Sequence, residues 1–127
     1  MNIQTIKSLK SVRPIVATTV YDSVMAQLAD QSGIDLLLVG DSVGTTLLGF
    51  ETTVNVTLEM MLHHTSAVSR VHTKALIVSD LPYGYSHDAF EHIFEASRKL
   101  IQAGASAVKI EGGYSIVPTI KRLVDCL

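Results

Sequence analysis

The sequence predicts an α/β fold built on a parallel sheet, and three observations support that prediction. Four short runs rich in Val, Ile and Leu alternate with longer stretches in which apolar residues recur at helical spacing. No linker, low-complexity run or shift in composition interrupts this alternation. Repeated strand–helix units pack into one body with parallel strands. We therefore expect residues 1–127 to form a single portion of one α/β domain.

The predicted strands are short and mostly continuous in apolar character. A continuous apolar run, unlike an alternating one, is typical of a strand buried on both faces, as in parallel sheets. The four strands are expected at Pro14–Val20, Asp35–Val39, Ala75–Val78 and Ser106–Ile110.

Helices are expected before, between and after these strands. They comprise a short N-terminal helix and the stretches Asp22–Gly33, Thr57–Val71, Asp88–Gly104 and Ser115–Leu127. Apolar residues at helical spacing predict buried stripes on these helices. Among them are Met25, Leu28 and Ala29 in the first stretch, and Phe90, Ile93, Phe94, Leu100 and Ile101 in the third.

Capping residues mark several helix ends. Asp22, Thr57 and Ser86 each stand where a side-chain oxygen can accept from the free N–H groups of a first turn. Gly33 and Gly104 stand where helices commonly end. Pro118 suits the first turn of the last helix, because the N–H that it lacks would be unpaired there in any case.

Two architectures contain parallel strands joined by helices: the doubly wound open sheet and the (β/α)8 barrel. A barrel has about 250 residues in eight units, or about 31 per unit. The acids that follow three of the predicted strands, Asp41, Asp80 and Glu111, are 39 and 31 residues apart, which fits barrel units with one longer loop. Four units would supply half a barrel.

Composition excludes several classes of protein. Ten Lys and Arg against 12 Asp and Glu give a formal net charge of −2, so no basic nucleic-acid surface is expected. The single cysteine, Cys126, allows neither an internal disulfide nor a cysteine-based zinc site. No apolar run approaches the ~20 residues of a membrane span. The N-terminal residues lack the features of a signal or transit peptide, so the expected compartment is the cytoplasm.

Polar side chains follow the apolar runs at the expected carboxyl ends of three successive strands. Asp41, Asp80 and Glu111 would gather at one edge of the sheet, where ligands bind in both architectures. Carboxylates on neighbouring strands repel unless a cation joins them, and oxygen ligands favour Mg²⁺. Lys109 points to the same sheet face as Glu111, and Ser42 adds a hydroxyl. This set suits a small α-keto acid bound to a metal ion.

From spacing alone, each acid also has a simpler interpretation. One carboxylate after a strand commonly caps the next helix or faces solvent, and Asp22 is expected to be such a cap. His72, His87 and His92 are expected on the surface, because no histidine has a metal-type spacing partner.

At these same residues the sequence resembles ketopantoate hydroxymethyltransferase. The matching strings are VYD (20–22), LLVGDSVG (37–44), HTSAV (64–68), SDLPYG (79–84) and AGASAVKIEGG (103–113), in the order and spacing of that family. The resemblance implies a (β/α)8 barrel, of which this chain supplies an N-terminal helix and about four βα units.

The resemblance also implies an activity and a set of site residues. The activity is transfer of a hydroxymethyl group from 5,10-methylenetetrahydrofolate to 3-methyl-2-oxobutanoate, giving 2-dehydropantoate on the route to pantothenate. By this resemblance Asp41 and Asp80 are Mg²⁺ ligands, and Glu111 holds a metal-bound water. Ser42 and Lys109 contact the keto acid, together with Asp41 and Asp80.

Family members are about twice as long as this chain and commonly form homo-oligomers. The glutamate that serves as their general base lies in the half beyond residue 127, so no catalytic base is assigned here, and the chain alone is expected to be inactive. Two alternatives remain open: a Mg²⁺-dependent keto-acid or phosphoenolpyruvate-type lyase on the same barrel, and a noncatalytic half-barrel remnant or subunit.

Overall fold

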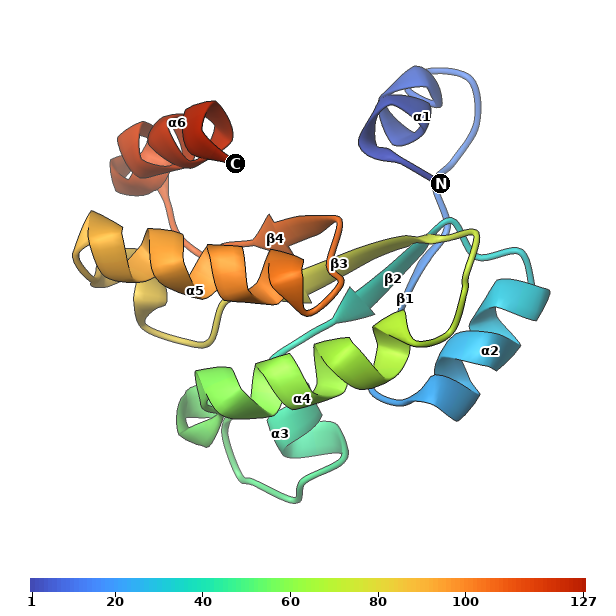
Figure 1. The fold of residues 1–127 in the computed structure, drawn as a ribbon, viewed down its shortest axis with the longest axis horizontal. Helices are drawn as coiled ribbons and strands as arrows, with labels where there is room; N and C mark the ends of the chain where they lie inside the picture. Colours follow the sequence, from blue (N-terminus) through green and yellow to red (C-terminus); the bar gives the residue numbers. More distant parts are fainter.

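A computed structural model describes residues 1–127 and contains one sheet of four parallel strands in the order β1-β2-β3-β4 (Figure 1). The strands are β1 Ala17–Thr19, β2 Leu36–Val39, β3 Leu76–Asp80 and β4 Ala107–Lys109. The α-helices are α1 Ile3–Ser8, α2 Ser23–Gln31, α3 Val43–Thr46, α4 Leu58–Ser69, α5 Phe90–Gln102 and α6 Val117–Cys126. Short 3₁₀ helices lie at η1 Thr53–Asn55, η2 Tyr85–His87 and η3 Tyr114–Ile116. The predicted α/β class with a parallel sheet is confirmed.

One hydrophobic core lies between the sheet and the helices α2, α4 and α5. On β2, Leu37 and Val39 are fully buried and belong to this core, whereas the alternate residues Leu36 and Leu38 are only partly buried. Helix α4 packs on both β2 and β3, and its Met61 is fully buried. In the view of Figure 1, α1 and α6 lie on the other side of the sheet from α4.

The prediction that the strands are buried on both faces is correct only for β3, all five of whose residues are buried. Strands β1, β2 and β4 each contain residues that are exposed or only partly buried. Strands β1 and β4 are edge strands, because β1 pairs only with β2 and β4 only with β3, whereas β2 pairs on both sides and is partly buried only at the alternate residues Leu36 and Leu38. Both edges of the sheet are therefore free, and an apolar strand at such an edge has no further neighbour to cover it.

The predicted caps of α2 and α4 are confirmed. The side chain of Asp22 accepts from the backbone N–H of Met25 at 2.8 Å, and that of Thr57 accepts from the N–H of Met60 at 3.3 Å. Pro118 lies in the first turn of α6, as expected.

Two expectations about the helices are wrong. Ser86 does not cap α5, because Gly84, at φ +89°, turns the chain into η2 and places Ser86 inside that turn. Met25 and Leu28 do not form a buried stripe on α2: they are 49% and 53% exposed, and Ala26 is the residue that packs into the core. Helix α2 lies beside the edge strand β1, so nothing covers its outer side.

None of the helices combines the length and apolar character needed to cross a bilayer.

Asp35 fastens the segment before β1 to the start of β2. Its buried carboxylate accepts from both terminal nitrogens of the Arg13 guanidinium, at 2.7 and 2.6 Å, and from the N–H of Val16 at 3.0 Å. The hydrogen bonds from Arg13, supported by the one from Val16, lower the pKa of Asp35 from 3.8 to about 2. Bidentate pairing of this kind is strong because both partners are charged.

We expect the contribution of Asp35 to folding stability to be lost in acid. Its pKa is lowered in the folded state, so the contribution is complete above about pH 4 and disappears as the pH falls toward about 2. Urea unfolding of the wild type and of Asp35→Asn, measured from pH 6 to pH 2, should give stabilities that converge at low pH. Arg13→Gln should weaken the same dependence, and a difference between wild type and Asp35→Asn that stays constant over this range would contradict the assignment.

Gly104, which ends α5, is required for two separate reasons. It has φ +109°, and a Cβ placed on it would lie 2.3 Å from the Cβ of Ser69 on α4. Gly104→Ala should therefore cost more than about 1 kcal/mol of unfolding free energy. Two matched variants separate the causes in urea unfolding. Gly33→Ala has the positive φ without the clash, and Gly113→Ala has neither. Equal effects of Gly104→Ala and Gly33→Ala would show that the contact with Ser69 is unimportant.

Candidate active site

The candidate site lies where β2, β3 and β4 end. Asp80 is the last residue of β3 and stands opposite Lys109, the last residue of β4, in the strand register. Asp41 follows β2 by two residues, and Glu111 follows β4 by two residues. The parallel topology thus brings Asp41, Asp80 and Lys109 together at one edge of the sheet, as the sequence predicts, while Glu111 lies in the loop beyond the end of β4.

Asp80 is the buried centre of this edge. Its side chain is 5% exposed, and its Oδ1 lies 2.8 Å from the Nζ of Lys109, whose own side chain is 49% exposed. Although the ammonium is at ion-pair distance, Oδ1 is buried and receives no well-oriented hydrogen bond. The other oxygen, Oδ2, accepts from the backbone N–H of Asp41 at 3.3 Å. The buried Oδ1 thus depends on one poorly aligned, half-exposed ammonium for its compensating charge, and a buried carboxylate is costly without full compensation.

Gly40 allows the β2 end to approach Asp80 closely. A Cβ on this residue would lie 2.9 Å from the Oγ of Ser42 and 3.3 Å from the Oδ2 of Asp80. Any other residue would therefore displace the Ser42 hydroxyl and crowd the Asp80 carboxylate. This packing explains why the apolar run of β2 leads into glycine before the acid.

Both aspartates are held in an environment that disfavours their charged forms. Burial raises the pKa of Asp41; Lys109 opposes this shift and Glu111 adds to it. Burial also raises the pKa of Asp80, and the neighbouring Lys109 ammonium opposes this shift. On balance the pKa values of both carboxyls are raised, because one ammonium does not fully compensate for two partly buried carboxylates. Groups with such shifts, gathered at strand ends, are typical of binding and catalytic sites.

Ser42 belongs to a second, uncharged part of the site. Its Oγ lies 2.8 Å from the hydroxyl of Tyr21, in the loop between β1 and α2. The backbone carbonyl of Tyr21 accepts from the Nδ1 of His64 at 2.7 Å. His64 is buried on α4, whereas His72, His87 and His92 are exposed, as expected. The sequence assigns no role to Tyr21 or His64, although both lie in matching strings, VYD and HTSAV, because their contacts join residues 21 and 43 positions apart.

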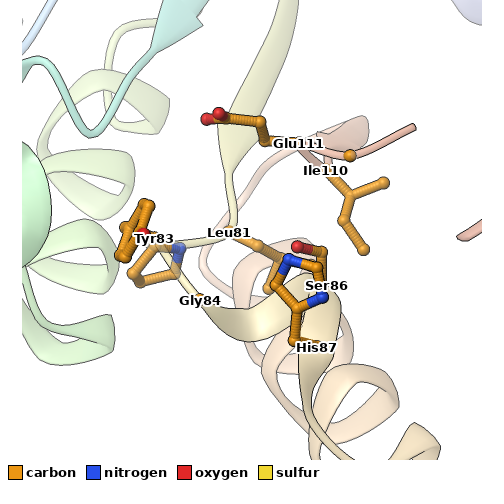
Figure 2. A pocket seen from close by; sticks show the side chains of 9 residues that line it. Leu81, Tyr83, Gly84, Ser86, His87, Ile110 and Glu111 are labelled. Atoms are coloured by element: carbon orange, nitrogen blue, oxygen red, sulfur yellow. The ribbon is translucent and has the colours of Figure 1, made fainter.

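Glu111 lies apart from the two aspartates. It is exposed and lines a small cavity of about 90 Å³ between the loops that follow β3 and β4. Leu81, Tyr83 and His87 line other parts of this cavity, and Glu111 and His87 lie on opposite sides of it in Figure 2. Glu111 is nevertheless close enough for its charge to raise the pKa of Asp41.

No three His, Cys, Asp or Glu side chains stand together in an arrangement that would hold a metal ion. The structure therefore joins Asp41, Asp80 and Lys109 but does not assemble the three-carboxylate cluster expected from the sequence. For a divalent cation the structure provides two carboxylates, those of Asp41 and Asp80. The Oδ1 of Asp80 is buried and receives no well-oriented hydrogen bond. Oxygen donors without cysteine fit a hard cation such as Mg²⁺.

Comparison with solved structures supports the barrel fold. Phosphonopyruvate hydrolase superposes with a TM-score of 0.71 at 18% identity, over 87% of this chain and 39% of that chain. A 2,3-dimethylmalate lyase, described as a member of the PEP mutase/isocitrate lyase superfamily, gives a TM-score of 0.67 at 19% identity, over 87% of this chain and 39% of that chain. At these identities the likeness concerns the fold alone, and it matches the parallel half-barrel described above.

Comparison of sequences is more specific. The chain is 49% identical over 125 residues to the 3-methyl-2-oxobutanoate hydroxymethyltransferase of Ralstonia pickettii, covering 95% of this chain and 46% of that protein. It is 50% identical over 115 residues to the enzyme of the same name from Trichodesmium erythraeum, covering 89% of this chain and 44% of that protein. The chain thus spans about half the length of these relatives. The profile of the family described as ketopantoate hydroxymethyltransferase matches residues 1–127, and the chain belongs to that family.

Proposed function

We propose that this chain supplies the metal-binding and keto-acid-binding part of a 3-methyl-2-oxobutanoate hydroxymethyltransferase. The enzyme would transfer a one-carbon unit from 5,10-methylenetetrahydrofolate to 3-methyl-2-oxobutanoate, giving 2-dehydropantoate and tetrahydrofolate. The observation that supports this most directly is the buried Asp80 carboxylate, placed beside Asp41 and Lys109 at the strand ends in a chain of this family.

Asp41 and Asp80 would hold the ion, with Glu111 outside the direct ligand set and reaching it through water. Mg²⁺, when bound, supplies a Lewis acid that stabilises negative charge on the keto oxygen and so makes the neighbouring C–H easier to deprotonate. Lys109 favours the ionised form of Asp80 and, being half exposed, can also pair with the carboxylate of the substrate. Ser42 would donate a hydrogen bond to the keto acid.

The overall reaction balances with one water molecule. The C3–H proton of the keto acid leaves, and C3 forms a bond to the folate-borne carbon. This proton and one from water end on the two folate nitrogens. The bonds from that carbon to the folate nitrogens are replaced by one bond to C3 and one to a hydroxyl oxygen supplied by water. We assign the removal of the proton to no residue of this chain, because the residues at this edge bind and neutralise charge.

Two further properties are predictions from the sequence: location in the cytoplasm, and assembly of the full-length protein into a homo-oligomer.

Binding of Mg²⁺ should depend on both aspartates. Asp41→Asn and Asp80→Asn each remove one of two charged ligands, and each should weaken Mg²⁺ binding by about tenfold or more in calorimetric titrations. Asp125→Asn removes an exposed acid on α6 and should leave the affinity unchanged. Lys109→Gln should weaken binding of 3-methyl-2-oxobutanoate in the presence of Mg²⁺. Unaltered Mg²⁺ affinity in both aspartate variants would contradict the proposal, and absence of any binding would favour a noncatalytic remnant.

Turnover is best tested in a chimera. We expect activity when residues 1–127 replace the matched portion of the Ralstonia pickettii relative, since the two are 49% identical there. The measurement is formation of 2-dehydropantoate that depends on 5,10-methylenetetrahydrofolate. Asp80→Asn in the chimera should reduce kcat/KM by at least about a hundredfold, as loss of an essential charged group at a reacting centre commonly does. A folded chimera that lacks this activity but cleaves isocitrate-like substrates would support the lyase alternative instead.

A further inference from the structure

A histidine and a tyrosine outside the charged site are connected to it through Ser42, and their arrangement points to a role in substrate binding. This inference rests on the proposed function, because it concerns the binding of the same keto acid. It starts from His64, a buried residue of α4 whose Nδ1 lies 2.7 Å from the backbone carbonyl of Tyr21. A carbonyl oxygen only accepts hydrogen bonds, so Nδ1 must carry the proton and donate it.

This hydrogen bond holds the loop in which Tyr21 lies. Val20, just before Tyr21, is buried in the core, and Asp22, just after it, caps α2. The tyrosine backbone is thus fixed on both sides by the fold, and its carbonyl is fixed by His64. The direction of the Tyr21 side chain therefore follows from contacts that do not involve any ligand.

The Tyr21 hydroxyl lies 2.8 Å from the Oγ of Ser42, the residue that follows Asp41. A phenol is the more acidic of the two hydroxyls and hence the better donor in this pair. When it donates to Ser42, the serine proton is free to point elsewhere, and chains of hydroxyls strengthen one another.

We propose that His64 and Tyr21 are positioning residues for the keto acid. His64 fixes the Tyr21 backbone, and Tyr21 donates to Ser42 so that the Ser42 hydroxyl donates to an oxygen of the bound α-keto acid. Neither residue touches the metal ion. The arrangement should therefore affect affinity for the keto acid and leave the affinity for Mg²⁺ alone unchanged.

The test is calorimetric titration of the full 127-residue chain with Mg²⁺ alone and then with 3-methyl-2-oxobutanoate at saturating Mg²⁺. Tyr21→Phe should raise the Kd for the keto acid about threefold to tenfold, the usual effect of one lost hydrogen bond. Ser42→Ala should do the same, and the double variant should be no worse than either single variant, since both act through one hydroxyl. Tyr114→Phe is the matched control, because Tyr114 is 93% exposed.

Two substitutions of His64 separate the hydrogen bond from the mere presence of a side chain. The amide nitrogen of Asn takes the place of Nδ1, whereas that of Gln lies nearer the place of Nε2. His64→Asn should therefore keep the Kd for the keto acid within about twofold of wild type, and His64→Gln should raise it about as much as Tyr21→Phe does. Ser69→Ala removes a different hydrogen bond of α4, to the carbonyl of Ala103 at 2.8 Å, and controls for a general loss of stability.

The outcomes distinguish this inference from the function on which it rests. Keto-acid binding that is insensitive to both Tyr21→Phe and His64→Gln would overturn the positioning role while leaving the proposed function intact. Equal effects of His64→Asn, His64→Gln and Ser69→Ala would also overturn it, because they would reduce the role to folding. Absence of Mg²⁺ and keto-acid binding in the unsubstituted chain would overturn both.

Discussion

The structure of this site depends on the burial of one carboxylate, that of Asp80. A charge removed from water is costly unless it is paired or hydrogen-bonded, and three neighbours of Asp80 reduce this cost in different ways. Lys109 brings a positive charge to Oδ1, the backbone of Asp41 donates to Oδ2, and Gly40 leaves room for the approach. The parallel register, which sets Lys109 opposite Asp80, is what makes this compensation possible. The pairing of the strands therefore determines which charged side chains meet at this edge of the sheet.

These contacts compensate only in part for the burial of the Asp80 charge, and this bears on the role of the site. The pKa values of Asp41 and Asp80 are both raised despite the ammonium between the strands, and Oδ1 of Asp80 lacks a well-oriented donor. A purely structural ion pair would gain stability from satisfying that oxygen with a second donor or from replacing both charges by apolar groups. Sites that bind charged ligands tolerate such a cost because the ligand removes it. The geometry at the strand ends thus favours a site made for a cation and an anion over a salt bridge that serves only the fold.

Much of this arrangement could be predicted from the sequence, and the part that could not has physical reasons. Apolar runs located the four strands, and the rule that parallel strands end at one edge placed Asp41, Asp80 and Lys109 together. The same rule does not fix Glu111, because it lies beyond the end of β4 in a loop whose path the apolar pattern does not specify.

The other differences arise from long-range contacts and from sheet edges. Hydrogen bonds such as those of His64 and Tyr21 join distant parts of the chain, so no helical or strand periodicity indicates them. The exposure of Met25 and Leu28 reflects an uncovered edge helix, whereas their spacing alone is that of a buried stripe. An apolar cavity of about 330 Å³, lined by Ile3, Val108, Ile110, Ile120, Leu123 and Val124, lies beside the other edge strand, β4. Two uncovered edges are what half of a closed barrel presents, since closure alone pairs every strand on both sides.

In the proposed reaction, binding of the keto acid and removal of its proton are separable tasks. Binding needs fixed charges and donors at the strand ends, and under the proposal Asp41, Asp80, Lys109 and Ser42, which lie together in this chain, would provide them. Deprotonation needs a base within hydrogen-bond reach of the substrate carbon, on the side away from the groups that hold the keto oxygen. The residues at this edge are already engaged with one another, so such a base is best supplied by strands that face them across the barrel. Under the proposed function, this division also gives a reason for the costly burial of Asp80: without a carboxylate to hold the ion, a base on the opposite side would have no acidified C–H to act on.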